Sequence, residues 1–100
     1  MTTEAEVLEE VRRLARTELG LERDIDVSSR LKEDLELDSM AMIVVAVGLE
    51  NRFRVKLEEH DAGLLATVAD LVQLVQRRRG EQEQRQRQEQ GLESGRGSGP

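Results

Sequence analysis

The sequence contains no cysteine, tryptophan or tyrosine, and it has a single phenylalanine and a single histidine. Without cysteine the chain can form neither a disulfide framework nor a thiolate metal site, and one histidine, His60, cannot build a metal cluster by itself. Because Phe53 is the only aromatic residue, the stacking platforms used to bind single-stranded nucleic acid are missing. The core must therefore be aliphatic, and nucleic acid is not the expected ligand.

Long apolar runs are also missing. No stretch approaches the roughly eighteen apolar residues of a membrane-spanning helix, and the N-terminus shows no signal-peptide pattern, so we expect a cytoplasmic protein. The net charge of −6 would repel phosphate backbones and anionic membrane surfaces. We therefore expect protein partners that present lysine and arginine, and neither nucleic acid nor a membrane.

A chain of 100 residues forms one small domain at most. We predict that residues 1–79 fold as this domain. Residues 80–100, a Gln/Glu/Arg run followed by a Gly-rich end, are expected to form a disordered low-complexity tail with a turn or two of helix near its start. A core of this size supplies only a few kcal/mol, so well-formed helices must support it.

Four segments carry helical signals: residues 3–19, 39–52, 58–65 and 67–79. Thr3 and Glu6 have the spacing of a capping box, as do Thr67 and Asp70, and Gly80 is expected to end the last helix. By periodicity alone the second segment could also be a buried strand, but no other strand exists to pair with it. The sequence therefore predicts an all-α fold, a small four-helix bundle with three longer helices and one short helix.

The segment between Gly20 and Asp38 shows no sustained periodicity and is expected to be a long first loop. Its apolar residues are spaced as if they pin the loop onto the core: Ile25, Val27, Leu31, Leu35 and Leu37. A loop of this length in a compact domain is usually functional.

Ser39 stands between this loop and the N-terminus of the second predicted helix. At such a place backbone N–H groups are unpaired and the helix dipole is positive, so a phosphate ester on Ser39 would be stabilised. Asp38 or Ser39 could equally be an ordinary N-cap. Taken alone, Asp-Ser before a helix is weak evidence for a site.

The wider sequence resembles the acyl carrier protein family. The stretch Leu-Lys-Glu-Asp-Leu-Glu-Leu-Asp-Ser-Met at residues 31–40 is similar to the family's modification motif, in which a serine follows aspartate and precedes leucine or methionine. Residues 48–57 resemble the family's helix-to-loop exit, and residues 67–72 resemble the start of its final helix. With the first helix, the resemblance covers residues 3–79.

The resemblance implies that Ser39 accepts 4′-phosphopantetheine from coenzyme A, transferred by a separate phosphopantetheinyl transferase. The thiol of this arm would hold an acyl group as a thioester. Asp38 would help the transferase to position its metal and the serine, and Met40 would occupy the adjacent hydrophobic recognition position. The chain would be a monomer and not an enzyme, with acyl-loading and acyl-processing partners such as ketosynthases or acyltransferases. His60 lies far from Ser39 in sequence, and we expect it to face solvent.

The chain departs from the family pattern at three places. Glu36 stands where members often have glycine, and Gly48 lies inside the second helix, where close packing or space for an acyl chain would explain it equally well. Ala41 and Val44 stand where the carriers of fatty acid biosynthesis commonly have acidic residues. This third departure favours polyketide, nonribosomal peptide or other secondary metabolism over housekeeping fatty acid synthesis.

The second helix carries two apolar stripes. Four residues at helical spacing are expected to face the core: Ile43, Ala46, Leu49 and Phe53. A neighbouring stripe is expected to dock on an apolar surface of a dedicated partner enzyme: Met40, Val44, Val47 and Asn51. Glu50 remains as an acidic docking contact.

Two other functions stay open. A carrier of aminoacyl or peptidyl groups would share the same serine and fold. In an unmodified helical interaction module, Ser39 would be only a cap. A carrier needs a free Ser39 hydroxyl, whereas a pure cap would turn that hydroxyl back to the backbone.

Overall fold

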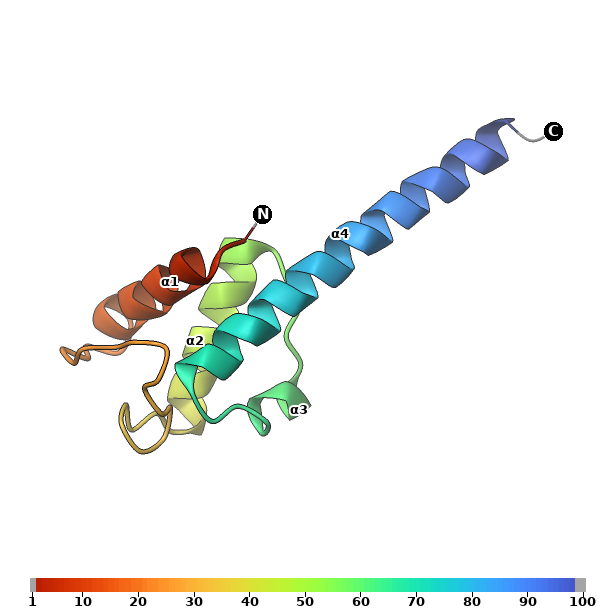
Figure 1. Ribbon diagram of the computed structural model, residues 1–100. Helices are drawn as coiled ribbons and strands as arrows, with labels where there is room; N and C mark the ends of the chain where they lie inside the picture. Colours follow the sequence, from red (N-terminus) through yellow and green to blue (C-terminus); the bar gives the residue numbers. More distant parts are fainter. Residues whose placement is uncertain (1, 99–100) are drawn as a thin grey trace.

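The computed structural model describes residues 2–98, and within this range the chain forms four α-helices and no strand. The helices are α1 (Glu4–Thr17), α2 (Ser39–Phe53), α3 (Glu59–Ala62) and α4 (Val68–Ser98). α1 packs against α2 and α4, and α2 also packs against α4, so these three enclose the core (Figure 1). The predicted all-α fold, with a long first loop and one short helix, is confirmed.

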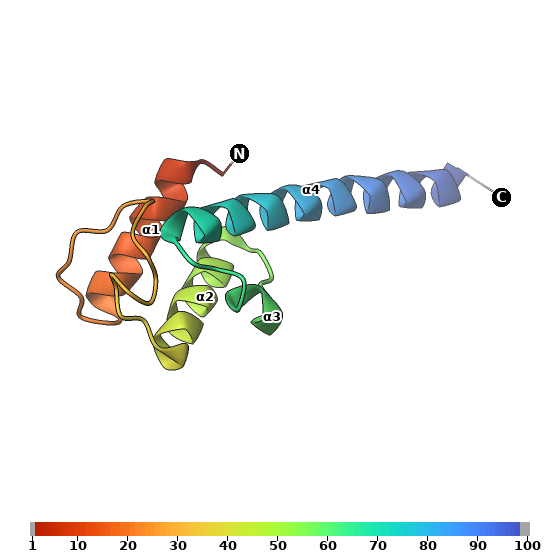
Figure 2. The same cartoon turned by 60° about the horizontal axis from the view of Figure 1, so that its bottom comes forward.

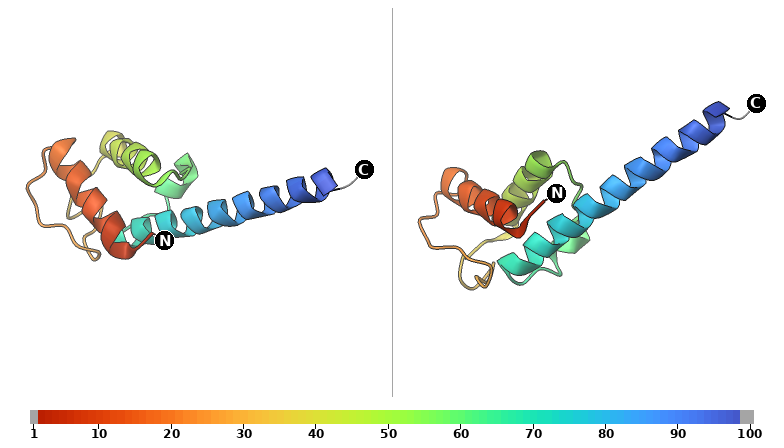
Figure 3. Two further views of the ribbon diagram at one scale, coloured as in Figure 1. Left: turned by 90° about the horizontal axis from the view of Figure 1, so that it is seen from above. Right: turned by 45° about the horizontal axis from the view of Figure 1, so that its top comes forward.

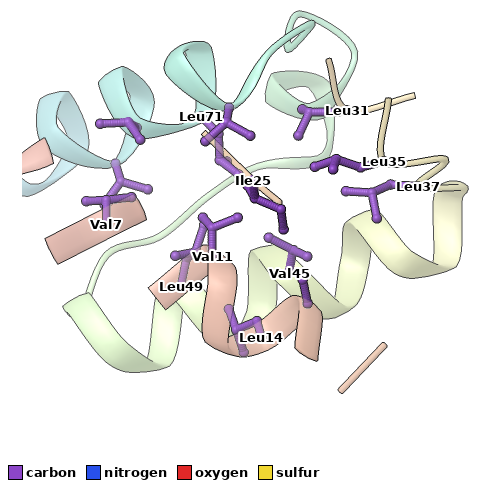
Figure 4. Close-up of a cluster of buried hydrophobic side chains, with 14 of the residues drawn as sticks. Val7, Val11, Leu14, Ile25, Leu31, Leu35, Leu37, Val45, Leu49 and Leu71 are labelled. Carbon is purple, nitrogen blue, oxygen red and sulfur yellow. The ribbon is translucent and has the colours of Figure 1, made fainter. Parts of the chain in front are cut away.

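The core is aliphatic, with Phe53 as the one ring among its buried residues. Figure 4 shows side chains from three helices and the first loop meeting in one cluster. The labelled members from the helices are Val7, Val11 and Leu14 of α1, Val45 and Leu49 of α2, and Leu71 of α4. Since each buried aliphatic side chain contributes about 1.5–3 kcal/mol, this shared cluster is what holds the three longer helices together.

The ends of α1 follow the sequence signals. The Glu6 N–H donates to Thr3 Oγ1 at 3.2 Å, which caps the start of the helix. At the other end Gly20 adopts a φ of 66°, and the Leu21 N–H donates to the Ala15 oxygen at 2.9 Å. A left-handed glycine just past a helix end is common, and here Gly20 lets the chain fold back for this hydrogen bond and directs it away from α1 into the loop.

The first loop is pinned to the core through apolar side chains, as the sequence predicts. Ile25, Leu31, Leu35 and Leu37 are buried, and Val27 is half-buried. In Figure 4 the loop residues Ile25, Leu31, Leu35 and Leu37 lie with the helix side chains in the same cluster. The loop is therefore part of the folded body.

The same loop also caps α4. The Val68 N–H donates to the Ser29 oxygen at 2.9 Å, and the Ala69 N–H donates to the Val27 oxygen at 2.8 Å. The first N–H groups of a helix have no partner inside it, so the loop supplies the missing acceptors. Residues far apart in sequence are thereby joined at the start of α4.

Thr67 and Asp70 form the predicted capping box. The Asp70 N–H donates to Thr67 Oγ1 at 3.2 Å, and the Thr67 N–H donates to Asp70 Oδ2 at 3.1 Å. The same carboxylate accepts the Ala66 N–H at 2.9 Å. These backbone hydrogen bonds, from Ala66 first and then Thr67, lower the pKa of Asp70.

α4 continues through Gly80 to Ser98, so the predicted helix end at Gly80 is not observed. Glycine in a helix costs about 1 kcal/mol relative to alanine, but the neighbouring Arg, Glu and Gln residues are strong helix formers. Arg79 Nε also lies 3.3 Å from Glu83 Oε1 across Gly80. The far part of α4 extends away from the other helices (Figure 3).

The boundary at residue 79 and the disorder of residues 80–100 stay predictions, and residues 99–100 lie outside the described range. A helix that leaves the bundle depends on its own propensity, which is marginal support in water.

α3 is joined to α4 by a buried carboxylate. Arg78 Nη2 lies 3.0 Å from both oxygens of Asp61, and the Glu58 N–H donates to Asp61 Oδ2 at 3.0 Å. The hydrogen bond from Glu58 and then the one from Arg78 lower the pKa of Asp61. His60, between these residues in sequence, is exposed to solvent as expected.

Candidate functional site

Asp38 caps the start of α2. Its backbone is extended, with φ −85° and ψ −176°, and its Oδ1 accepts the Ala41 N–H at 2.8 Å. Its backbone oxygen accepts the Met42 N–H at 2.9 Å. The structure thus assigns the N-cap role to Asp38, and Ser39 becomes the first residue of the helix.

The Ser39 side chain is exposed, and within the described part of the chain its hydroxyl makes no hydrogen bond. Two other serines differ in this respect. Ser28 Oγ donates to Asp26 Oδ1 at 2.6 Å, and Ser29 Oγ accepts the Asp26 N–H at 3.0 Å. Ser39 therefore shows the free hydroxyl that a carrier needs, and its side chain does not act as a cap.

The backbone around Ser39 also suits a phosphate ester. Ala41 and Met42 use their N–H groups on Asp38, whereas the N–H groups of Ser39 and Met40 have no acceptor among the described residues. These two donors lie at the positive end of the α2 dipole, where anions are stabilised. Figure 2 shows that the start of α2 lies at one extremity of the molecule, away from the far end of α4. The residues present therefore fit a phosphate-linked group on Ser39.

The segment before Asp38 is held in a turn at Glu36. Leu35 and Leu37 are buried on either side of it, and Glu36 itself adopts a φ of 54°. This left-handed conformation costs a residue other than glycine about 1 kcal/mol. Glu36, which stands where family members often have glycine, thus occupies a strained backbone position. Glycine would adopt this conformation without strain.

One face of α2 presents apolar side chains to solvent. Met40 is 68% exposed, Ile43 53% and Val47 46%. The expectation that Ile43 faces the core is wrong, and Ala46 is only half-buried. The buried residues of α2 are Val45, Leu49 and Phe53.

An open groove of about 570 Å³ lies beside this face, between α1 and α2. Val44, Val47 and Asn51 line it, and Ile43 joins them. The predicted docking residues Val44, Val47 and Asn51 are thus brought together with a residue that the sequence placed in the core. Glu10, Arg13 and Arg52 line its charged rim.

Glu50 and the charged residues beside the groove bind groups within the chain itself. Glu50 Oε2 accepts the Leu57 N–H at 2.9 Å, so its carboxylate anchors the chain after α2 instead of projecting as a free acidic contact. The charged rim of the groove is paired within itself, since Arg13 Nε lies 3.0 Å from Glu10 Oε1. The predicted docking role of Glu50 therefore has no support from its geometry.

Gly48 lets α1 approach α2. A methyl group built on Gly48 would lie 2.5 Å from Leu14 Cδ2 and 2.6 Å from Leu14 Cδ1. Leu14 is buried in the core, so moving its methyl groups aside would disturb the packing of α1 against α2. Of the two explanations left open by the sequence, this contact supports close packing.

Arg23 is a residue of the site region that the sequence reasoning missed. Its Nη2 donates to Glu36 Oε2 at 2.6 Å, and its Nη1 donates to the Asp34 oxygen at 2.7 Å. Arg23 lies in a loop without periodicity, so no pattern in the sequence pairs it with these residues.

Together these features define a small helical protein that presents a free serine hydroxyl at a helix start, where the backbone would stabilise a phosphate ester. Residues 9–75 match the family model described as "Phosphopantetheine attachment site". The chain is 30% identical over 76 residues to a protein named acyl carrier protein from Rhodococcus erythropolis, covering 75% of this chain and 84% of that protein. It is also 30% identical over 81 residues to an acyl carrier protein from Kineococcus radiotolerans, covering 80% of this chain and 100% of that protein.

The fold has a counterpart among solved structures. The crystal structure of an acyl carrier protein from Thermotoga maritima matches with a TM-score of 0.69 at 24% sequence identity, covering 78% of this chain and 92% of that chain. This likeness shows the fold.

The chain belongs to the acyl carrier protein family, whose members carry a phosphopantetheine attachment site. Its prosthetic group is accordingly 4′-phosphopantetheine. Carrier proteins are generally not enzymes, and they work by interacting with enzymes. Within residues 2–98, no helix combines the length and apolar character needed to cross a membrane.

Proposed function

We propose that this chain holds acyl intermediates as thioesters on a 4′-phosphopantetheine arm attached to Ser39, and that it presents them to partner enzymes without catalysing a reaction itself. The observation that carries the proposal is the free, exposed hydroxyl of Ser39 directly after the Asp38 cap of α2. An unmodified interaction module would not need this hydroxyl to be free. The cytoplasm is the compartment that we propose for this work.

The roles of the residues follow from their positions. Ser39 supplies the oxygen that forms the phosphate ester, while the pyrophosphate bond of coenzyme A breaks and adenosine 3′,5′-bisphosphate leaves. The transferase must remove the Ser39 proton, because no base contacts this hydroxyl among the described residues. Asp38 fixes the start of α2 through its hydrogen bond to the Ala41 N–H. The N–H groups of Ser39 and Met40, at the positive end of the α2 dipole, would stabilise the negative charge of a phosphate ester on Ser39. When bound, the arm supplies a thiol that forms the thioester with the acyl group.

The exposed face of α2 supports a more specific proposal about partners. Ser39, Ile43 and Val47 follow one another at four-residue spacing, so they form one row on the helix. We infer that partner enzymes meet this row and the neighbouring Met40 and Val44 through an apolar surface. An apolar α2 face favours polyketide or another specialised pathway over the acidic docking of fatty-acid carriers.

The proposal is tested by loading the chain with an acylated arm. The apo protein is incubated with an acyl-coenzyme A, Mg²⁺ and a broad-specificity phosphopantetheinyl transferase, and its intact mass is recorded. We expect a gain of one acyl-phosphopantetheine on the wild type and none on Ser39→Ala. Neutral hydroxylamine should then remove the acyl group and leave the arm, because it cleaves a thioester and leaves a phosphate ester intact.

Other outcomes would point to other functions. A wild-type mass that stays unchanged with several transferases would contradict the carrier proposal and favour an interaction module. If the arm attaches but the cognate loading enzyme transfers only aminoacyl groups, the chain is an aminoacyl or peptidyl carrier of the same fold.

A further inference from the structure

Arg23 lies in the first half of the long loop, yet its guanidinium holds the segment directly before Ser39. Nη1 donates to the backbone oxygen of Asp34 at 2.7 Å, and Nη2 donates to Oε2 of Glu36 at 2.6 Å. The planar guanidinium of Arg23 therefore binds both a main-chain oxygen and a side-chain carboxylate of the same turn. Arginine suits this two-point hold because its donors lie in a rigid fork, whereas the ammonium group of lysine is a compact charge on a flexible stem.

Glu36 is the residue of this turn whose conformation needs support. Its φ of 54° is uncommon for a residue with a Cβ atom. Leu35 and Leu37 are buried on either side, so Glu36 is an exposed residue between two residues that are fixed in the core. The direction of its peptide planes decides how the chain enters Leu37 and Asp38, and hence where Ser39 lies.

The other side-chain contacts of this segment do not reach Glu36. The Arg30 N–H donates to Asp34 Oδ2 at 2.8 Å, and Arg30 Nε lies 3.5 Å from the same oxygen. The Leu37 N–H donates to the Leu31 oxygen at 3.0 Å, which fixes the chain after the turn. Within the described residues, Arg23 is the charged side chain that contacts the Glu36 carboxylate.

We propose that Arg23 is a positioning residue for attachment of the arm. It holds Glu36 in the left-handed conformation, so that Asp38 caps α2 and Ser39 is presented to the transferase. Arg23 acts through Glu36 and touches neither Ser39 nor the incoming group. This inference rests on the proposed role of Ser39 and adds the residue that sets its position.

The test compares the rate of arm attachment among single variants of the full chain. Attachment is followed by intact mass with coenzyme A and one transferase, and kcat and KM for the carrier are determined separately. Arg23→Ala should lower kcat/KM roughly three- to tenfold, the effect expected when a charge-assisted, exposed contact is lost. Arg23→Lys should recover only part of this loss, since lysine cannot make both contacts at once.

Arg30→Ala is the matched control. It removes the same charge from the same loop, but Arg30 does not contact Glu36 and its backbone N–H remains bonded to Asp34. We expect less than about a twofold change in kcat/KM for this variant. The Tm of Arg23→Ala should stay within a few degrees of the wild type, because the Arg23–Glu36 pair is exposed and exposed pairs add little stability.

Repeating the comparison in a Glu36→Gly variant shows whether Arg23 acts by positioning Glu36 or by direct contact with the transferase. In Glu36→Gly the left-handed turn no longer needs a restraint, so adding Arg23→Ala to Glu36→Gly should leave kcat/KM nearly unchanged. If Arg23→Ala lowers the rate equally in both backgrounds, the transferase recognises Arg23 directly and the positioning role is overturned. This comparison also holds if Arg23→Ala alone folds poorly, because the glycine background relieves the strained turn.

The same assay separates the role of Arg23 from the carrier function. If the wild type takes up no arm at Ser39, both fall together. If the wild type is modified and Arg23→Ala is modified as fast, the carrier function stands and the role of Arg23 is overturned.

Discussion

At the start of α2, Asp38 and Ser39 are adjacent but have different tasks. The sequence predicted this pair and could not say which residue caps the helix, because aspartate and serine have nearly equal capping preferences. The backbone decides the question, since the extended conformation of Asp38 turns its carboxylate to the Ala41 N–H. The serine hydroxyl is thereby left out of the cap.

Asp38→Ala should affect both stability and modification. Losing the cap is expected to lower the free energy of unfolding by about 1 kcal/mol and to slow attachment of the arm. Asp38→Asn is the matched variant, because asparagine caps a helix about as well as aspartate but carries no charge. Thermal unfolding and intact-mass kinetics of both variants provide the measurement.

If the carboxylate helps the transferase to position its metal, Asp38→Asn should keep the wild-type Tm and still be modified more slowly. Equal modification rates for Asp38→Asn and wild type would limit Asp38 to its capping role.

Gly48 is the second residue for which the structure favours one of two roles, namely close packing against α1. Helix propensity favours alanine over glycine by about 1 kcal/mol, but a methyl group there would meet Leu14 Cδ2 at 2.5 Å. Overpacking of this kind typically costs about 1–3 kcal/mol. We therefore expect Gly48→Ala to lower the free energy of unfolding by roughly 1 kcal/mol, measured by urea denaturation.

A double-mutant cycle with Leu14→Ala serves as the control for Gly48. The added methyl group fills part of the space that Leu14 leaves, so the loss in the double variant should be smaller than the sum of the two single losses. Additive losses would show that Gly48 does not act through Leu14.

At the scale of elements, α2 shows why its buried face could not be chosen from the sequence. The helix is apolar on nearly every side, and periodicity identifies a core face only when the opposite face is polar. The positions of α1 and α4 select Val45, Leu49 and Phe53 for the core and leave Ile43 exposed. Two residues of the predicted docking stripe, Met40 and Val47, are exposed, as docking would require.

The docking role of this exposed face is tested by a charge substitution. Val47→Asp should lower kcat/KM for transfer of the acyl group by the cognate partner enzyme about tenfold, because a charge would be buried against an apolar surface. Leu64→Asp is the matched control, as Leu64 is an exposed apolar residue at 77% exposure outside the groove. Both variants should keep the wild-type Tm and accept the arm normally. Equal turnover of Val47→Asp and Leu64→Asp would contradict docking through the α2 face.

The buried carboxylate between α3 and α4 predicts a pH dependence. The Glu58 N–H and Arg78 lower the pKa of Asp61 in the folded state. A lowered folded-state pKa contributes stability that is present above the ordinary aspartate pKa of about 3.9 and is lost as the pH falls below it. The free energy of unfolding of the wild type should therefore fall below about pH 4.

Asp61→Asn isolates this contribution. We expect it to lower the free energy of unfolding at pH 7 by about 2 kcal/mol, because Arg78 loses a charged partner. Its stability should then depend less on pH than that of the wild type between pH 7 and pH 3. Asp24→Asn, which removes an exposed carboxylate in the first loop, serves as the control. Parallel pH curves for Asp61→Asn and wild type would show that Asp61 carries none of this dependence.

At the scale of the whole molecule, features set by neighbouring residues could be predicted from the sequence, whereas contacts between distant residues could not. The all-α class, the caps at Thr3 and Thr67 and the end of α1 shortly before Gly20 depend on neighbouring residues, so a sequence pattern can report them. The Arg23 contact with Glu36 joins residues 13 positions apart in a loop without periodicity, and no local pattern could show it. At Gly80 the local signal was misleading, because strong helix formers on both sides carry α4 onward.

These parts serve one arrangement. The loop that packs on the core also caps α4 and leads into the start of α2, so the free serine lies at the end of a structured segment. The far part of α4 extends in another direction (Figure 1) and leaves this site open. We therefore expect Ser39 to be the serine that carries the arm.

The most direct test is to locate the arm on the full-length chain by tandem mass spectrometry after reaction with coenzyme A and a transferase. We expect a single phosphopantetheine on the peptide containing Ser39, none on the peptides containing Ser28 and Ser29, and no modification of Ser39→Ala. An arm on another serine, or an unmodified wild type alongside a control carrier protein that the same transferase modifies, would contradict this expectation.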